Sequence, residues 1–158
     1  MKNKIRIGIM IMILVTVIGF NCDYGKKFDN DFKNHVKDTD IVLSDKDPLN
    51  PITMFIKNNK PIGFEFRSSP EFGDYTKQAF LNGDGQLEKM IIRKTYQNNI
   101  ETPFDSIYVI KPLINKITVF TDQNTKGIEI QNPGLIQNEL FNIEELYNKI
   151  LSMNHKIQ

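Results

Sequence analysis

Few side chains in this sequence could do acid–base or metal chemistry. Histidine occurs twice, as His35 and His155, and neither has a second histidine or a cysteine at metal-site spacing. The sequence holds no Gly-x-Ser-x-Gly turn and no phosphate-binding glycine loop. A carboxylate-dependent hydrolase would need a pair drawn from the acidic residues of the central region, which are Glu65, Glu71, Asp74, Glu88, Glu101 and Asp105. Because most carboxylates on half-buried strands simply face solvent, and sequence spacing cannot pair them, we predict no catalytic residues and no enzyme.

One run of residues, Phe80-Leu81-Asn82-Gly83-Asp84-Gly85-Gln86-Leu87-Glu88, is rich in oxygen-bearing side chains and glycine. It resembles the calcium loops of dockerins and of propeller-type repeats, whose pattern is Asp-x-Asn-x-Asp-Gly-x-x-Asp followed by an apolar strand. Calcium takes several oxygens at once, and a tight loop can supply them. The resemblance places four groups at ligand positions, namely Asn82, Asp84, the Gln86 carbonyl and Glu88. The fold could add Asp74 or Asp105 as further ligands.

The same run departs from the calcium pattern, and a simpler interpretation accounts for it. Phe80 stands where the pattern has its first Asp, and no Glu stands at the twelfth place of an EF-hand loop. Asn-Gly and Asp-Gly are the favoured pairs for tight hairpin turns, since both central positions take positive φ. A plain hairpin turn is therefore the first expectation, and a weak calcium site is the alternative.

Cys22 is the only cysteine, so the chain can form neither an internal disulfide nor a thiolate metal cluster. It follows a basic segment with Lys2, Lys4 and Arg6 and the uncharged, mostly apolar stretch 7–20. This arrangement is typical of a secretory signal. Fourteen residues of helix span about 21 Å, which is short of the ~30 Å hydrocarbon core. A cleaved signal over residues 1–21 is therefore favoured over a transmembrane anchor.

The residues Ile18-Gly19-Phe20-Asn21-Cys22 resemble the lipobox of bacterial lipoproteins. The usual lipobox has a branched apolar residue three places before the cysteine and Ala or Gly just before it. Gly19 and Asn21 hold those places here. The resemblance implies that Cys22 becomes the new N-terminus and carries acyl chains, including palmitate, and two or more chains anchor a protein stably. It implies a bacterial cell-envelope location, with the inner or outer membrane left open.

Charge excludes one class of partner. The whole chain has a net charge of +1, and removing residues 1–21 leaves 17 basic and 19 acidic residues, a balance near −2. No basic field remains to attract nucleic acid, so we expect none as a partner.

The elements that must position these residues are mainly strands. Residues 52–56, 62–66, 75–81, 87–96, 106–110, 116–120 and 127–131 are short apolar or alternating runs, separated by Asn, Gly and Pro turns. In the last run Ile128 and Ile130 are expected to face inward. The aromatic residues of this region are expected to be core rather than a ligand groove: Phe55, Phe64, Phe66, Phe72 and Phe80.

The end of the chain has a helical period, with Leu140, Ile143, Tyr147 and Ile150 on one face. Asn142 is the predicted N-cap, because Glu145 stands three residues later. The Asn132-Pro133-Gly134 run is expected to be the turn that ends the sheet.

Residues 22–50 are dense in Asp, Lys and Asn, which predicts a lipidated N-terminus and a polar tether with a helical turn or two around 28–37. Tyr24, Phe28, Phe32 and Val36 recur every four residues, so a short amphipathic helix is the alternative. Residues 51–158 are expected to form an α+β domain: an antiparallel meander of about seven short strands, with the C-terminal helix packed on one face and the other face solvated.

The function expected is a non-enzymatic binding or interaction module of the envelope, with a membrane and an envelope protein as partners. The alternatives are a lipid-anchored inhibitor or immunity-type protein and the carboxylate-dependent hydrolase. Exposed apolar residues on an edge strand would favour the inhibitor.

Overall fold

The computed structural model describes residues 23–45, 47–69, 71, 73–96, 104–121 and 123–154. The predicted signal peptide, the lipobox, Cys22, Glu101 and His155 lie outside these residues. In the described part of the chain no helix is both long and apolar enough to cross a membrane.

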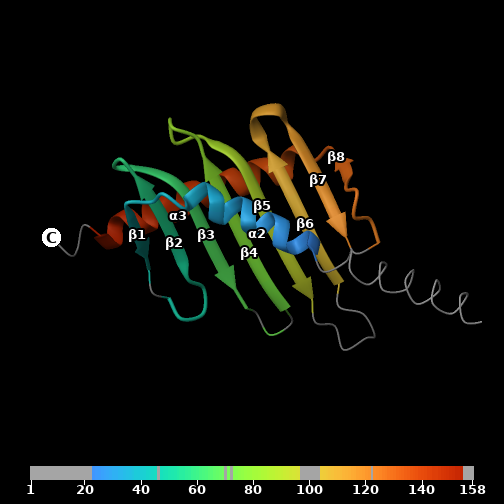
Figure 1. The fold of residues 1–158 in the computed structure, drawn as a ribbon, viewed down its shortest axis with the longest axis horizontal. Coiled ribbons are helices and arrows are strands. Elements are labelled where there is room, and N and C mark those ends of the chain that lie inside the picture. The colour runs from blue at the N-terminus through green and yellow to red at the C-terminus, as the bar shows by residue number, and fades with distance from the viewer. Residues whose placement is uncertain are drawn as a thin grey trace, which may run out of the picture.

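The centre of the molecule is one antiparallel sheet whose eight strands follow one another in chain order (Figure 1). The strands are β1 (Ile41–Ser44), β2 (Ile52–Lys57), β3 (Lys60–Ser68), β4 (Gly73–Leu81), β5 (Leu87–Tyr96), β6 (Phe104–Lys111), β7 (Lys116–Thr121) and β8 (Ile128–Ile130). The predicted antiparallel α+β meander is confirmed at this level. The sheet has one strand more than expected, because the four-residue β1 comes from the segment predicted to be a tether.

Turn chemistry explains the order of the strands. The β2–β3 turn holds Asn58 and Asn59 at φ 51° and 60°, the backbone that two-residue hairpin turns require. The short 3-10 helix Pro112–Ile114 joins β6 to β7 and ends on Asn115 in the left-handed region. Each link is local, so a meander follows without crossovers.

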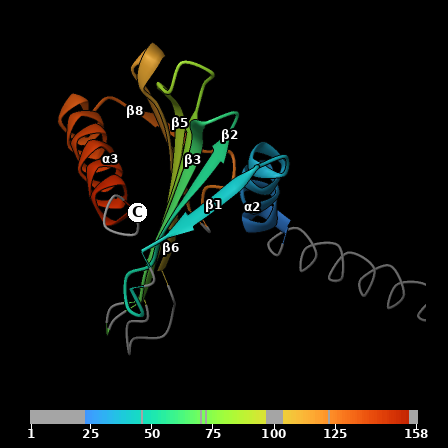
Figure 2. The same cartoon turned by 90° about the vertical axis from the view of Figure 1, so that its left-hand side faces the viewer.

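The C-terminal helix, α3 (Pro133–Asn154), covers one face of the sheet, as predicted (Figure 2). Ile136 and Ile150 are buried against core residues of the sheet, including Ile92 and Ile117. The prediction of its start was wrong. Asn132 Oδ1 accepts the backbone N–H of Leu135 at 3.0 Å, so Asn132 caps the helix and Pro133 is its first residue. Asn142, the predicted cap, lies inside the helix.

A second helix, α2 (Asp23–Val36), covers the opposite face (Figure 2). Phe28 and Phe32, four residues apart, are buried at 8% and 2% exposure against Phe80, Ile91 and other residues of the sheet. The predicted polar tether is therefore wrong over α2 and β1, and so is the prediction that this face of the sheet is solvated. Burying two aromatic side chains outweighs the polar composition of the segment.

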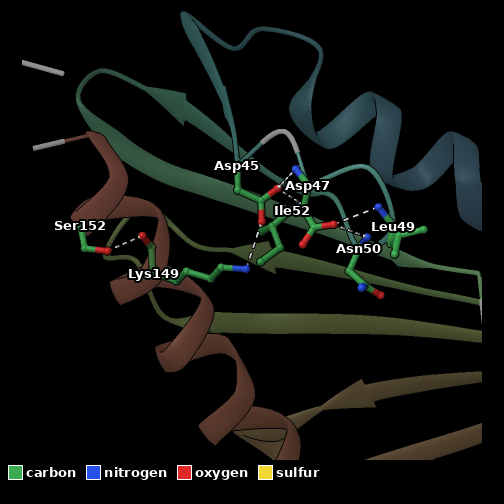
Figure 3. Close-up of polar contacts among 7 residues, drawn as sticks. All are labelled: Asp45, Asp47, Leu49, Asn50, Ile52, Lys149 and Ser152. Atoms are coloured by element: carbon green, nitrogen blue, oxygen red, sulfur yellow. Dashed lines mark hydrogen bonds and ion pairs between the residues drawn. The ribbon is translucent and has the colours of Figure 1, made fainter. Parts of the chain in front are cut away.

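The loop between β1 and β2 closes onto α3 through Asp45, whose side chain is fully buried (Figure 3). One oxygen of Asp45 accepts the backbone N–H of Ile52 at 2.9 Å, and the other lies 3.3 Å from Lys149 Nζ. Next to it, Asp47 Oδ1 accepts the N–H groups of Leu49 and Asn50 at 2.9 and 3.0 Å. This network joins the first edge of the sheet to the end of the chain.

Both edge strands carry exposed apolar side chains. Ile41 and Val42 of β1 are 45% and 56% exposed, and Ile128 of β8 is 53% exposed. Ile130 packs against the core as predicted, but Ile128 does not, because β8 is the last strand and α3 begins only five residues later.

Candidate ligand-binding cavity

Polar residues gather on the half of the sheet that α2 does not bury. Along β3, β4 and β5, every second side chain faces the α2 side. Beneath the helix these residues are apolar, with Phe80 on β4 and Ile91 on β5. Toward the other end of the same strands they become polar.

Strand register aligns these polar residues in rows. Glu65 on β3 pairs with Gln78 on β4. In the next row, Arg67 pairs with Thr76, which pairs with Arg93 on β5, and in the last row Asp74 pairs with Thr95. Alternating charged and polar side chains thus form a continuous wall across three strands.

This wall and one flank of α2 enclose a cavity of about 430 Å³, called here the polar cavity. Asp29 and Lys33 supply the flank, since residues four apart lie on the same side of a helix. The cavity has three basic side chains and three acidic ones, Lys33, Arg67, Arg93, Asp29, Glu65 and Asp74. The formal charges of these six side chains sum to zero.

Two ion pairs position α2 over the sheet. Each carboxylate oxygen of Asp29 lies 3.3 Å from a guanidinium nitrogen of Arg93. On the other flank of the helix, an Asp31 oxygen lies 3.6 Å from Lys89 Nζ. Both basic residues come from β5, on either side of Ile91. These partly exposed pairs contribute little stability, but they set the position of the helix relative to the cavity.

Glu65 is held rigidly in the cavity wall. One of its oxygens lies 2.7 Å from Arg67, and the other accepts the Gln78 side-chain amide at 2.9 Å. Gln78 is only 6% exposed. Neighbouring side chains therefore engage both oxygens of Glu65.

Two charged groups of the polar cavity have no ion-pair partner among the described residues. They are Lys33, which is exposed on α2, and Asp74, at the start of β4, which accepts the Ser69 hydroxyl at 2.8 Å. They are the charges that a ligand can reach without breaking an existing pair.

The structure places the acidic residues that were candidates for a hydrolase pair in different parts of the fold. Glu65 and Asp74 line the polar cavity, whereas Glu71 is exposed in the β3–β4 connection and Glu88 is exposed beside the β4–β5 turn. The side chain of Asp105 is outside the described part. The sequence alone did not indicate that Arg67, Arg93, Thr76 and Gln78 are site residues. Their only signal was polar residues at every second strand position, which is also what a solvated face shows.

The run of residues similar to calcium loops forms a hydrogen-bonded hairpin turn. Asn82 Oδ1 accepts the N–H groups of Asp84 and Gln86 at 3.0 and 2.9 Å, and the Gln86 carbonyl accepts the Asn82 N–H at 2.9 Å. Asp84 and Glu88 are exposed, and the fold does not bring Asp74 to this end of β4.

Among the described residues no group of three or more His, Cys, Asp or Glu side chains could hold a metal ion. Calcium binding by this turn stays a prediction. Melting the protein with calcium and with a chelator tests it, and an unchanged midpoint would remove the site.

His35 belongs to the packed part of the protein and not to a tether. Its Nε2 lies 2.8 Å from the Ile62 carbonyl oxygen, and its ring lies 5.0 Å from the Phe80 ring. It does not line the polar cavity, and its contacts are those of a residue that holds α2 to β3 and β4.

The aromatic residues of the strands are core, as predicted. Phe64 and Phe80 are buried, and Phe55 and Phe66 pack against the two core clusters, while Phe72 lies outside the described residues. On the α3 side, a second and more apolar hollow of about 480 Å³ lies between the helix and the turns at the end of the sheet.

No family model matches the chain, and comparison with curated proteins and with solved structures found no match either.

Proposed function

We propose that this chain is a lipid-anchored protein of the bacterial envelope whose folded domain binds a small polar ligand in the polar cavity, without catalysing a reaction. The observation that carries the binding half of the proposal is the cavity itself. Its wall is built from three strands, its charges balance, and its deepest polar residues are already oriented by hydrogen bonds. Sites with convergent, preorganised polar groups are typical of specific ligand binding.

The leader and its single cysteine support the anchoring half. The sequence has a basic start, a 14-residue apolar stretch and a lipobox-like ending at Cys22. The structure adds one fact: α2 begins at Asp23 and packs on the sheet. A lipid on Cys22 would hold the domain close to the bilayer, with no long spacer between them.

Replacing Cys22 by Ala tests the anchor. We expect the wild-type protein to take up a palmitate analogue and to sediment with membranes, and the Cys22→Ala protein to do neither. A variant that stays on the membrane without label would show that an uncleaved leader is the anchor instead.

Filling the cavity tests the binding. Thr76 lies in the middle row of the wall, so Thr76→Trp should block the cavity; Thr125→Trp makes the same change at an exposed turn position. We would melt each protein with millimolar glucose, N-acetylglucosamine, glycine and trialanine. At least one of these probes should raise the midpoint of the wild type and of Thr125→Trp, but not of Thr76→Trp. Equal shifts in all three proteins would contradict the proposal.

The second candidate function is an inhibitor-type protein that engages an envelope partner, and the exposed Ile41 and Val42 on β1 favour it. The test is a pull-down from envelope extract with the wild type, Val42→Glu and the control Thr125→Glu. Loss of a specific partner only with Val42→Glu would support this function. A partner retained by all three proteins would exclude the β1 edge.

A further inference from the structure

We infer that the ligand of the polar cavity is a short peptide with a free amino terminus and a free carboxyl terminus. This inference rests on the proposed binding function and specifies its ligand class. It follows from which charges of the cavity are already paired and from where the unpaired ones lie.

The paired charges form the frame of the site. Arg93 is held by Asp29, and Arg67 lies against Glu65. A ligand that used these groups would have to compete with existing ion pairs. Lys33 and Asp74 have no such pairs among the described residues, so they offer one positive and one negative charge at low cost. A zwitterion complements both, with its carboxylate on Lys33 and its ammonium on Asp74.

The length of the cavity favours a peptide over a single amino acid. Asp74 lies four residues along β4 from Gln78, which places the two rows about 13 Å apart. α2 crosses the strands beyond the Gln78 end, where Phe80 is buried beneath it. An extended tripeptide spans about 10 Å and fits within that length, whereas one amino acid, at about 3.5 Å, fills only a small part of it.

The middle of the cavity suits a peptide backbone. Thr76 in the middle row and Thr95 in the last row, beside Asp74, are half-buried, and neither hydroxyl has a hydrogen-bond partner among the described residues. A hydroxyl both donates and accepts, so each can pair with a peptide N–H or carbonyl. A neutral sugar could use these hydroxyls too, but it would bring no opposite charge to Lys33 or Asp74.

The experiment is a calorimetric titration of the whole chain, purified in mild detergent, with four forms of trialanine: free, N-acetylated, C-amidated and blocked at both ends. With the wild type we expect amidation and acetylation each to weaken binding about tenfold, which is the usual effect of one charge-assisted contact.

Two variants show which side chain binds which terminus of the peptide, and each variant has a matched control. Lys33→Gln should bind free and amidated trialanine equally, and Asp74→Asn should bind free and acetylated trialanine equally. The controls Lys27→Gln on the other flank of α2 and Asp84→Asn on the β4–β5 turn remove the same charges elsewhere, and should keep the wild-type preferences. This crossed pattern would assign the carboxylate to Lys33 and the ammonium to Asp74.

Three results would overturn the inference, and they have different consequences for the proposed function. If doubly blocked trialanine binds as tightly as the free form, the ligand is not recognised by its charged termini. If trialanine fails to bind while glucose binds and Thr76→Trp abolishes that binding, the inference falls and the proposed function stands. If none of the probes binds the wild type, both fall together.

Discussion

At the scale of single residues, Phe32 is the side chain that joins α2 to the sheet. It is 2% exposed, and its ring meets those of Phe55 and Phe80 edge-on at centroid distances of 5.5 and 5.2 Å. Edge-to-face contacts of this kind add to the stabilisation that burial provides. The position of α2, and therefore one wall of the polar cavity, depends on this aromatic cluster.

Replacing Phe32 by Ala should lower the free energy of unfolding by about 3–5 kcal/mol, because it removes a buried ring and leaves a cavity. Urea unfolding of the wild type and Phe32→Ala measures this difference. Lys26→Ala, an exposed change on the same helix, should have almost no effect. A loss of less than about 1 kcal/mol in Phe32→Ala would mean that α2 is not part of the cooperative fold.

Asp47 should make stability depend on pH. The N–H groups of Asn50 and then Leu49 donate to its carboxylate and hold its pKa below the ordinary value of 3.8. Since the folded pKa is lower than the unfolded one, Asp47 stabilises the folded state above about pH 4 and loses that effect as the pH falls through the folded pKa.

Thermal melts of the wild type and Asp47→Asn between pH 6 and pH 2 measure this contribution, because Asn keeps an acceptor oxygen without the charge. The wild type should have the higher midpoint at pH 6, and the two midpoints should converge toward pH 2. A difference that does not change with pH would show that the charge of Asp47 contributes nothing.

At the scale of elements, α3 is fixed to the sheet by a buried ion pair between Lys77 on β4 and Glu139. Their side chains are only 12% and 9% exposed. Taking two charges out of water is costly, so the pair adds little net stability, but leaving one charge without the other is strongly unfavourable. The pair therefore favours one position of α3 over others.

Glu139→Leu should lower the free energy of unfolding by about 3–5 kcal/mol, since it strands the Lys77 ammonium in the core. Adding Lys77→Met should recover most of that loss, because the double variant buries no charge. Urea unfolding of the wild type, both single variants and the double variant measures the coupling. Additive effects of the two changes would show that Lys77 and Glu139 do not interact in solution.

Elements defined by local signals were predictable, and those defined by tertiary contacts were not. The seven predicted strands follow from alternating apolar residues and Asn or Gly turns, which act over a few residues. The strand Ile41–Ser44 is too short to stand out in a polar segment. Asn132-Pro133 has the features of both a turn and a helix start, and only packing of the first turn of α3 on the core distinguishes them.

At the scale of the whole molecule, two helices sandwich a sheet whose α2 face is apolar at one end and polar at the other (Figure 2). α2 is only 14 residues long and lies across the apolar end. The uncovered end is where the polar cavity forms. The same short helix thus completes the core and leaves room for a ligand.

The candidate site could not be predicted from the sequence. Its rows exist because Glu65 pairs with Gln78 and Thr76 pairs with Arg93, and register between strands depends on long-range packing. The recurrence of Phe28 and Phe32 allowed a short helix, but the polar composition around them favoured a tether. Without a helix on that face, the same alternating polar residues predicted a solvated surface.

The central claim is that the polar end of the α2 face binds ligand. The most direct test is an amide NMR titration of the isotope-labelled whole chain with glucose, N-acetylglucosamine, glycine and trialanine in turn. With at least one of these probes we expect saturable shifts at residues 74–78 and 93–95, and none around Leu140 and Ile143 in the apolar hollow on the α3 side. Shifts confined to that hollow, or no saturable shift in β4 and β5, would contradict it.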